Sequence, residues 1–161
     1  MKAELEGVAK FWAPSDHVWN LDIKQGAGAE ERHGVDVDPG DTLEVPHSKN
    51  ATANFLIKFP GDKQHSYINV VELKPDKKGP VTRPQTADDT DMVAIAAFEC
   101  RGCEPVSWNP TGGYCAETAD GVLYDDVGFK DAEDWCEYDE KSGESMMIGH
   151  KIPHEFVLYR G

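Results

Sequence analysis

Two of the four cysteines stand at a spacing that thiol chemistry uses, in the run Cys100-Arg101-Gly102-Cys103. A CxxC pair in a reducing compartment serves either as a redox centre or as half of a zinc site. Redox pairs begin a helix, whose dipole lowers the thiol pKa, but here Glu104-Pro105 follows and suits a turn better. We therefore expect Cys100 to be a buried, inert thiol rather than a reactive one.

Carboxylates gather in two further places. The segment Asp36-Val37-Asp38-Pro39-Gly40-Asp41 is similar to a calcium loop, but it lacks the glycine at the sixth place and the glutamate at the twelfth that an EF-hand requires. We expect an acidic β-turn there. The acidic stretch 131–140 has no matched histidine and no Gly-rich cradle, so a solvated face is expected.

No enzyme motif is recognisable in the chain. There is no nucleophile elbow, no HExxH, no phosphate loop and no GxGxxG. His150 and His154 would share a face only on a helix, and Pro153 between them argues against one. We expect a protein that is not an enzyme. The four tryptophans could form a carbohydrate platform, although such rings more often anchor a core: Trp12, Trp19, Trp108 and Trp135.

Charge narrows the choice of partner. The chain has 161 residues, with 30 acidic and 16 basic side chains and a formal net charge of -14. This charge repels nucleic acid and anionic lipid, so neither is an expected partner. The longest clean apolar run, Met92 to Phe98, is far shorter than the roughly 20 residues of a membrane span. Glu4 and Glu6 interrupt the place of a signal-peptide core, so a cytoplasmic protein with reduced cysteines is expected.

The hydrophobic periodicity indicates strands almost everywhere. Trp19, Leu21 and Ile23 alternate with polar or smaller neighbours, which is typical of a half-buried strand. Turn signals such as Asp38-Pro39-Gly40 and Phe59-Pro60-Gly61 separate such runs, which predicts an all-β fold, sandwich-like or barrel-like, with little helix. One helical turn is expected around 130–135. Further strands are predicted at 53–58, 67–73, 92–100 and 154–159.

A proline-containing, charged segment divides the sequence. Residues 75–91 contain Pro75, Pro80 and Pro84 and only one larger apolar residue, Val81, which is typical of a connector. We expect a single domain over 1–161, made of a half at 1–74, the connector, and a half at 92–161. Each half is small for independent stability, so one shared core is expected.

Several short motifs of the second half resemble the eukaryotic CXXC motif-containing zinc-binding protein family. They are Phe98-Glu99-Cys100-Arg101-Gly102, Glu104-Pro105-Val106, Trp135 and Tyr138-Asp139-Glu140-Lys141. The resemblance covers nearly the whole chain and is weaker in the first half. It implies two packed β-rich halves of related topology, and a binding role more readily than a reaction.

In that family two CxxC pairs of the first half hold a zinc ion. The matching positions here read Lys24-Gln25-Gly26-Ala27-Gly28 and Lys58-Phe59-Pro60-Gly61-Asp62, without a cysteine. Structural zinc needs four donors, and only Asp62 among the replacements is an ordinary ligand. The resemblance therefore implies former zinc-ligand positions that cannot hold the ion in the family's way: Gln25, Gly28, Phe59 and Asp62.

The turns that carried the ligands are expected to persist. Gly26 and Gly28 permit the positive backbone angles of such a turn, and Pro60-Gly61 favours a tight one. We expect Phe59 to fill the space of the ion, which contributes about 1.5 to 3 kcal/mol if the ring is buried. A re-formed site from an oxygen and two imidazoles is an alternative: His33, Asp62 and His65.

These observations favour a non-catalytic cytoplasmic module with a degenerate zinc site and no cofactor, which binds a protein partner. The alternatives are metal handling by the remaining cysteines, histidines and aspartates, and a carbohydrate-binding sandwich. Six residues are a candidate partner surface, or else a structural set with an arginine–carboxylate pair and buried aromatics: Arg101, Glu104, Trp135, Tyr138, Asp139 and Glu140.

Overall fold

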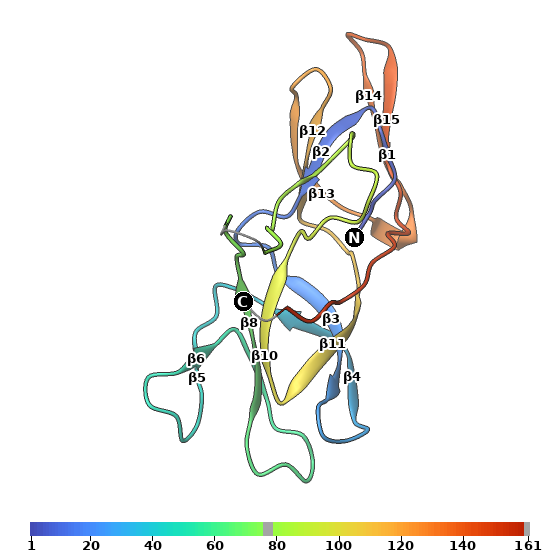
Figure 1. Ribbon diagram of the computed structural model, residues 1–161. Helices are drawn as coiled ribbons and strands as arrows, with labels where there is room; N and C mark the ends of the chain where they lie inside the picture. Colours follow the sequence, from blue (N-terminus) through green and yellow to red (C-terminus); the bar gives the residue numbers. More distant parts are fainter. Residues whose placement is uncertain (76–78, 160–161) are drawn as a thin grey trace. The chain divides into compact units, whose positions relative to one another are not determined.

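The computed structural model describes residues 1–75 and 79–159 and is built almost entirely of antiparallel β-strands (Figure 1). The predicted all-β class is confirmed. Within these residues the helical element is a single 3-10 turn, η1 (Lys130–Ala132), where one helical turn was expected. No helix in the described part of the chain is long and apolar enough to cross a membrane.

The chain forms two compact units, each assembled from separate segments. Unit 1 takes its described residues from Met1–Pro14, Lys74–Ile95 and Pro110–Glu155. Unit 2 takes them from Ser15–Leu73, Ala96–Asn109 and Phe156–Gly161.

This division differs from the predicted halves 1–74 and 92–161, because strands from the two ends of the sequence pair with one another. Residues 76–78 of the predicted connector 75–91 lie outside the described residues, and the rest of it contributes to unit 1. A short strand begins there at Gln85, whose buried side chain exchanges two hydrogen bonds, of 2.7 and 2.8 Å, with the backbone of Ala3.

Unit 1 contains a four-stranded and a three-stranded sheet. In the first the order is β13-β12-β2-β9, and in the second it is β1-β15-β14. The tilted rings of Phe11, Tyr114 and Phe129 pack together in its core with centroids 5.4 to 6.4 Å apart. The strands are β1 (Leu5–Glu6), β2 (Val8–Trp12), β9 (Gln85–Thr86), β12 (Tyr114–Thr118), β13 (Leu123–Val127), β14 (Trp135–Asp139) and β15 (Glu144–Ile148).

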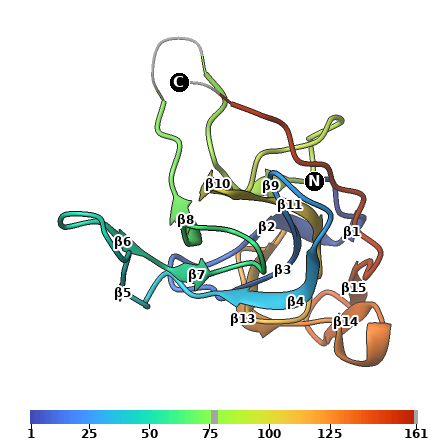
Figure 2. The same cartoon turned by 90° about the horizontal axis from the view of Figure 1, so that it is seen from below.

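Unit 2 contains two three-stranded sheets and a short hairpin. The sheets have the orders β11-β3-β4 and β10-β8-β7, with β8 in the middle of the second (Figure 2). Residues 19, 21 and 23 of β3 are buried, as their alternation predicted. The strands are β3 (Trp19–Gln25), β4 (Glu31–Val37), β5 (Leu43–Glu44), β6 (Thr52–Ala53), β7 (Phe55–Ile57), β8 (Ser66–Val71), β10 (Ala97–Arg101) and β11 (Cys103–Trp108).

Two of the predicted strands are wrong in whole or in part. Of the run 92–100, only the end forms β10, because the backbone of Val93 and Ala94 bonds instead to Met1 and Arg83. The segment 154–159 forms no strand. Its apolar pattern suits a sheet, but no neighbouring strand pairs with it, and Leu158 is largely exposed.

The tryptophans do not form a carbohydrate platform. Trp19 and Trp108 are buried together in unit 2, with ring centroids 5.9 Å apart, and Phe98 contacts Trp19 edge-on at 5.7 Å. Trp12 and Trp135 are half-buried in unit 1. Rings in these positions contribute to packing in the core. They do not form the exposed coplanar platform that a carbohydrate-binding site would need.

Candidate functional site

Two loops of unit 2 carry the four former zinc-ligand positions. The first loop (residues 25–30) joins β3 to β4 and is closed by the N–H of Gln25, which donates to the carbonyl of Glu30 at 2.8 Å. The second loop (residues 58–65) joins β7 to β8. In it the N–H of Asp62 donates to the carbonyl of Phe59 at 3.1 Å, and Gly61 has a φ of 87°. A proline followed by a glycine with positive φ is typical of a type II turn, so the predicted tight turn is confirmed.

A side-chain hydrogen bond joins the two loops. The Nε2 amide of Gln25 donates to Oδ1 of Asp62 at 2.7 Å, although the two residues are 37 positions apart. Only 6% of Gln25 is exposed. Hydrogen bonds to charged groups contribute about 1.5 to 3 kcal/mol, and a buried amide that loses its partner incurs a desolvation penalty. This bond therefore fixes the spacing of the loops.

Gly28 provides room for this amide. A Cβ atom at position 28 would lie 2.2 Å from Oε1 and 2.7 Å from Cδ of Gln25. Neither Gly26 nor Gly28 has a positive φ, so the expectation that these glycines supply unusual backbone angles is wrong. The physical need at Gly28 is space, since the side chain of Gln25 lies where a Cβ would stand.

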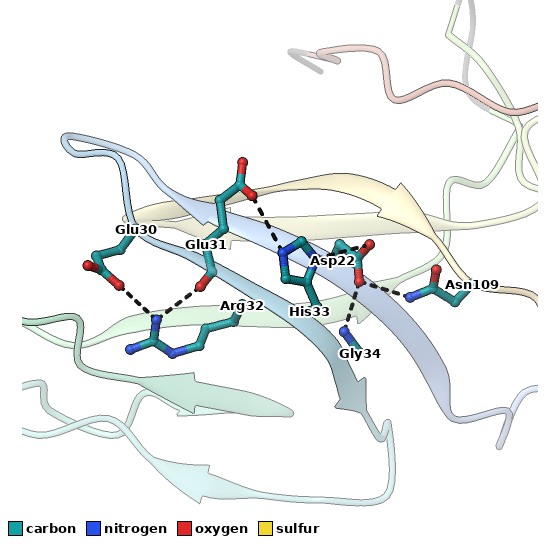
Figure 3. Close-up of polar contacts among 7 residues, drawn as sticks. All are labelled: Asp22, Glu30, Glu31, Arg32, His33, Gly34 and Asn109. Carbon is teal, nitrogen blue, oxygen red and sulfur yellow. Dashed lines mark hydrogen bonds and ion pairs between the residues drawn. The ribbon is translucent and has the colours of Figure 1, made fainter.

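Phe59 is buried, as predicted, with 1% of its surface exposed. The guanidinium of Arg32 lies over its ring, with Cζ 5.6 Å from the centroid, which is a cation–π distance. Glu30 accepts a hydrogen bond from the Arg32 guanidinium at 2.9 Å, and the carbonyl of Glu31 accepts another at 3.0 Å (Figure 3). The ring of the second loop is thereby tied to the strand that follows the first loop.

The side chains at these four positions do not fit a zinc ion. A glycine and a phenylalanine offer no donor, and the glutamine directs its N–H toward Asp62 instead of presenting a lone pair. One carboxylate remains where structural zinc requires four donors. The resemblance implied this loss of the ligands, and the contacts of Gln25 show that its amide is already engaged.

The alternative site of His33, Asp62 and His65 is not assembled. Nδ1 of His33 lies 3.5 Å from Asp22, and Nε2 lies 3.6 Å from Glu31. Asp62 instead bonds to Gln25. Across residues 1–75 and 79–159, no group of three or more His, Cys, Asp or Glu side chains could hold a metal ion.

A partly exposed hydrogen-bond network around Asp22 supports β3, the strand that leads into the first loop. Asn109 donates to Oδ1 of Asp22 at 3.0 Å and the N–H of Gly34 donates at 2.8 Å (Figure 3). The pKa of Asp22 lies below its usual value, first because of the Asn109 hydrogen bond and second because of the Gly34 N–H. Sequence reasoning missed this network, since Asn109 is 87 residues from Asp22.

The CxxC pair lies at a chain reversal beside the first loop. Gly102 has a φ of 76° between β10 and β11, its carbonyl accepts from the N–H of Gly26 at 2.9 Å, and Cys103 pairs with Gln25 in the β-ladder. Cys103 is buried, whereas Cys100, which was expected to be buried, is only half-buried. Desolvation is the main cause that raises the pKa of Cys100 to about 11 and that of Cys103 to about 12. A thiolate is required for metal binding and for redox attack, so neither thiol is poised for chemistry near pH 7.

The six residues of the predicted partner surface divide between the units. Arg101 and Glu104 belong to unit 2, where Glu104 pairs with Lys24 at 3.1 Å. The other four lie on the β14–β15 hairpin of unit 1, with Tyr138 exposed and Trp135 half-buried: Trp135, Tyr138, Asp139 and Glu140.

Two hairpins of unit 1, β12–β13 and β14–β15, each expose apolar side chains and carry several carboxylates. The rings of Tyr124 and Trp135 meet edge-on at 5.3 Å. Leu123 is 67% exposed, and so are 59% of Tyr138 and 47% of Val122. The sequence reasoning did not single out the pair Val122-Leu123. The adjacent apolar residues after Asp120-Gly121 were the available signal.

Comparisons with known proteins agree with this architecture. The family profile described as "CXXC motif containing zinc binding protein, eukaryotic" matches residues 1–157. The CXXC motif containing zinc binding protein of Homo sapiens is 39% identical over 77 residues, 47% of this chain and 47% of that protein. The chain thus spans about half the length of this relative. UPF0587 protein CG4646 of Drosophila melanogaster is 30% identical over 161 residues, 98% of this chain and 93% of the relative.

Two solved structures are similar over most of the chain. A hypothetical protein from Plasmodium falciparum superposes with a TM-score of 0.76 at 30% identity, covering 92% of this chain and 91% of that chain. The structure titled "Crystal Structure of C1orf123" superposes with a TM-score of 0.75 at 26% identity, covering 92% and 90%.

Proposed function

Because the chain belongs to the eukaryotic CXXC motif-containing zinc-binding protein family, whose activity its name does not define, we propose that it is a non-catalytic module of the cytoplasm that binds a protein partner. The observation that carries this proposal is the exposure of apolar side chains on two hairpins of unit 1, Val122 and Leu123 on β12–β13 and Tyr138 on β14–β15, here together called the hairpin surface.

The composition of the hairpin surface suits protein recognition. Tyrosine is enriched in interfaces because its ring contributes a large apolar area and a hydroxyl that forms hydrogen bonds. Leu123 and Tyr138 stand exposed on adjoining hairpins whose spacing is held by the Tyr124–Trp135 contact. Such fixed, exposed anchors lose little conformational entropy when a partner covers them.

Charge at this surface favours a basic partner segment. Between residues 117 and 144 the only basic side chains are Lys130 and Lys141, whereas aspartates and glutamates are abundant. The pKa of the Asp139 carboxyl lies below its usual value, mainly because the backbone N–H of Lys141 donates to it, which favours the charged form. An excess of carboxylates on these hairpins attracts lysines and arginines of a partner and repels acidic proteins.

The absence of a catalytic role is supported by how the reactive groups are used. The Cys100 and Cys103 thiols have raised pKa values, and Asp22 and Asp62 accept structural hydrogen bonds. Catalytic groups are instead tuned toward the working pH. These side chains thus support a scaffold role.

Affinity capture with surface variants tests the proposal. The double variant Leu123→Ser/Tyr138→Ser is compared with wild type and with Leu158→Ser, a matched change at an exposed leucine of unit 2. Loss of hot-spot side chains costs about 2 kcal/mol or more each, so at least tenfold less of a specific partner is expected on the double variant. Equal capture by all three baits would contradict the proposed surface, provided that circular dichroism shows all three folded.

A further inference from the structure

We infer that Gln25, Gly28, Phe59 and Asp62 form a side-chain lock that joins the two loops of unit 2, so that this unit closes without a metal ion. The lock occupies the positions that the family resemblance assigns to zinc ligands. It is a set of mutually dependent contacts, and each of its parts can be tested separately.

The first part is the interloop hydrogen bond. Gln25 Nε2 and Asp62 Oδ1 are 2.7 Å apart, and the glutamine is almost fully buried. A metal cross-link and this hydrogen bond restrict the same pair of loops. The difference is that the hydrogen bond needs no cofactor and exists only in the folded chain.

The second part is steric. The amide of Gln25 lies against Gly28 so closely that a Cβ there would be 2.2 Å from Oε1. A side chain at position 28 and the observed position of the Gln25 amide therefore exclude each other. Gln25 and Gly28 are a matched pair, because the long side chain of the glutamine occupies the space that the glycine, having no side chain, leaves open.

The third part comes from the turn at 59–62. This turn directs the Phe59 ring into the core while the Asp62 carboxylate meets the glutamine, and the Phe59 carbonyl accepts the Asp62 N–H at 3.1 Å. Arg32, held by Glu30 of the first loop, lies over the ring. The loops are thus linked twice, once through Asp62 and once through Phe59 and Arg32.

A rescue experiment tests the matched pair. Gln25→Ala, Gly28→Ala and the double variant are unfolded in urea, with Gln64→Ala as the control because Gln64 is an exposed glutamine of the second loop. We expect Gln25→Ala to reduce the folding equilibrium constant about tenfold or more and Gln64→Ala to leave it within about twofold. Gly28→Ala is expected to be damaging in wild type and nearly neutral in the Gln25→Ala background. If the losses in free energy of unfolding caused by Gln25→Ala and Gly28→Ala simply added in the double variant, the proposed lock would be contradicted.

Restoring the thiols provides an independent test of the loop geometry. A chain with Gln25→Cys, Gly28→Cys, Phe59→Cys and Asp62→Cys is titrated with Co²⁺, whose thiolate complexes absorb visible light. We expect binding of one Co²⁺ per chain to this variant and no such absorption from wild type. A folded variant that leaves Co²⁺ unbound would show that the loops lack the spacing of ligands. If the variant does not fold, the rescue experiment decides. A fall in the wild-type thermal midpoint on adding a chelator would overturn the inference outright.

Discussion

Phe59→Ala is expected to destabilise unit 2 strongly. The ring is 1% exposed, so its removal leaves a cavity that the surrounding strands can only partly fill. Phe-to-Ala changes in cores cost about 3 to 5 kcal/mol. The lost contact with the partly exposed Arg32 adds about 0.5 to 1 kcal/mol at most.

This cost translates into a large change in thermal stability. For chains of 150 to 250 residues, each kcal/mol shifts the midpoint by about 2 to 4 °C, so we expect Phe59→Ala to lower it by about 6 to 20 °C. Urea unfolding followed by tryptophan fluorescence measures the same loss as a free energy. Trp19 and Trp108 lie in the same unit and report on it directly.

Phe156→Ala is the matched control. Phe156 also belongs to unit 2 and contacts the ring of Phe98, but it is 37% exposed. Its truncation is expected to cost at most about 1 to 2 kcal/mol, because part of the ring already faces water. A Phe59→Ala loss below about 1 kcal/mol, or one equal to that of Phe156→Ala, would refute the reasoning that buried packing joins the loops.

Three further predictions concern thiols, pH and a buried amide. Because burial raises the pKa of Cys103 to about 12, iodoacetamide at pH 7.5 should alkylate the exposed Cys136 first, and equal rates, read by mass spectrometry, would contradict this. Asn109→Ala removes the main cause that lowers the pKa of Asp22. The loss of stability caused by Asn109→Ala should be complete at pH 7. It should shrink as the pH falls below about 4, because Asp22 then becomes protonated as the pH passes its lowered folded-state pKa. Equal differences in urea midpoint between wild type and variant at pH 7 and at pH 3 would contradict this prediction. Gln85→Ala leaves a buried backbone N–H and C=O unpaired and should cost about 2 to 4 kcal/mol in urea unfolding, and a loss below about 1 kcal/mol would show that these bonds are replaced.

Local patterns in the sequence predicted the all-β fold class but not which strands pair with one another. The alternation of Trp19, Leu21 and Ile23 reports burial on one face, which neighbouring residues largely determine. The same reasoning fails for 154–159, because a strand also needs an edge to pair with, and the sequence does not show which edges are available. The assembly of each unit from separate segments likewise depends on pairings such as β2 with β12, which lie about a hundred residues apart in the sequence.

Only part of the candidate site could be predicted from the sequence. The family resemblance identified the four positions, and the buried state of Phe59 follows from its apolar ring. The role assigned to Gly28 was wrong, because the backbone angle is a local property whereas the actual constraint is the side chain of Gln25 lying across it. The bond from Gln25 to Asp62 could not be predicted, since nothing in either segment specifies a partner 37 residues away.

The zinc content of the natively folded chain tests the central claim most directly. The measurement is elemental analysis of wild-type protein purified without added metal or chelator, expressed as zinc atoms per chain. The side-chain lock predicts a value close to zero in a fully folded sample. One zinc atom per chain, retained through gel filtration, would contradict it.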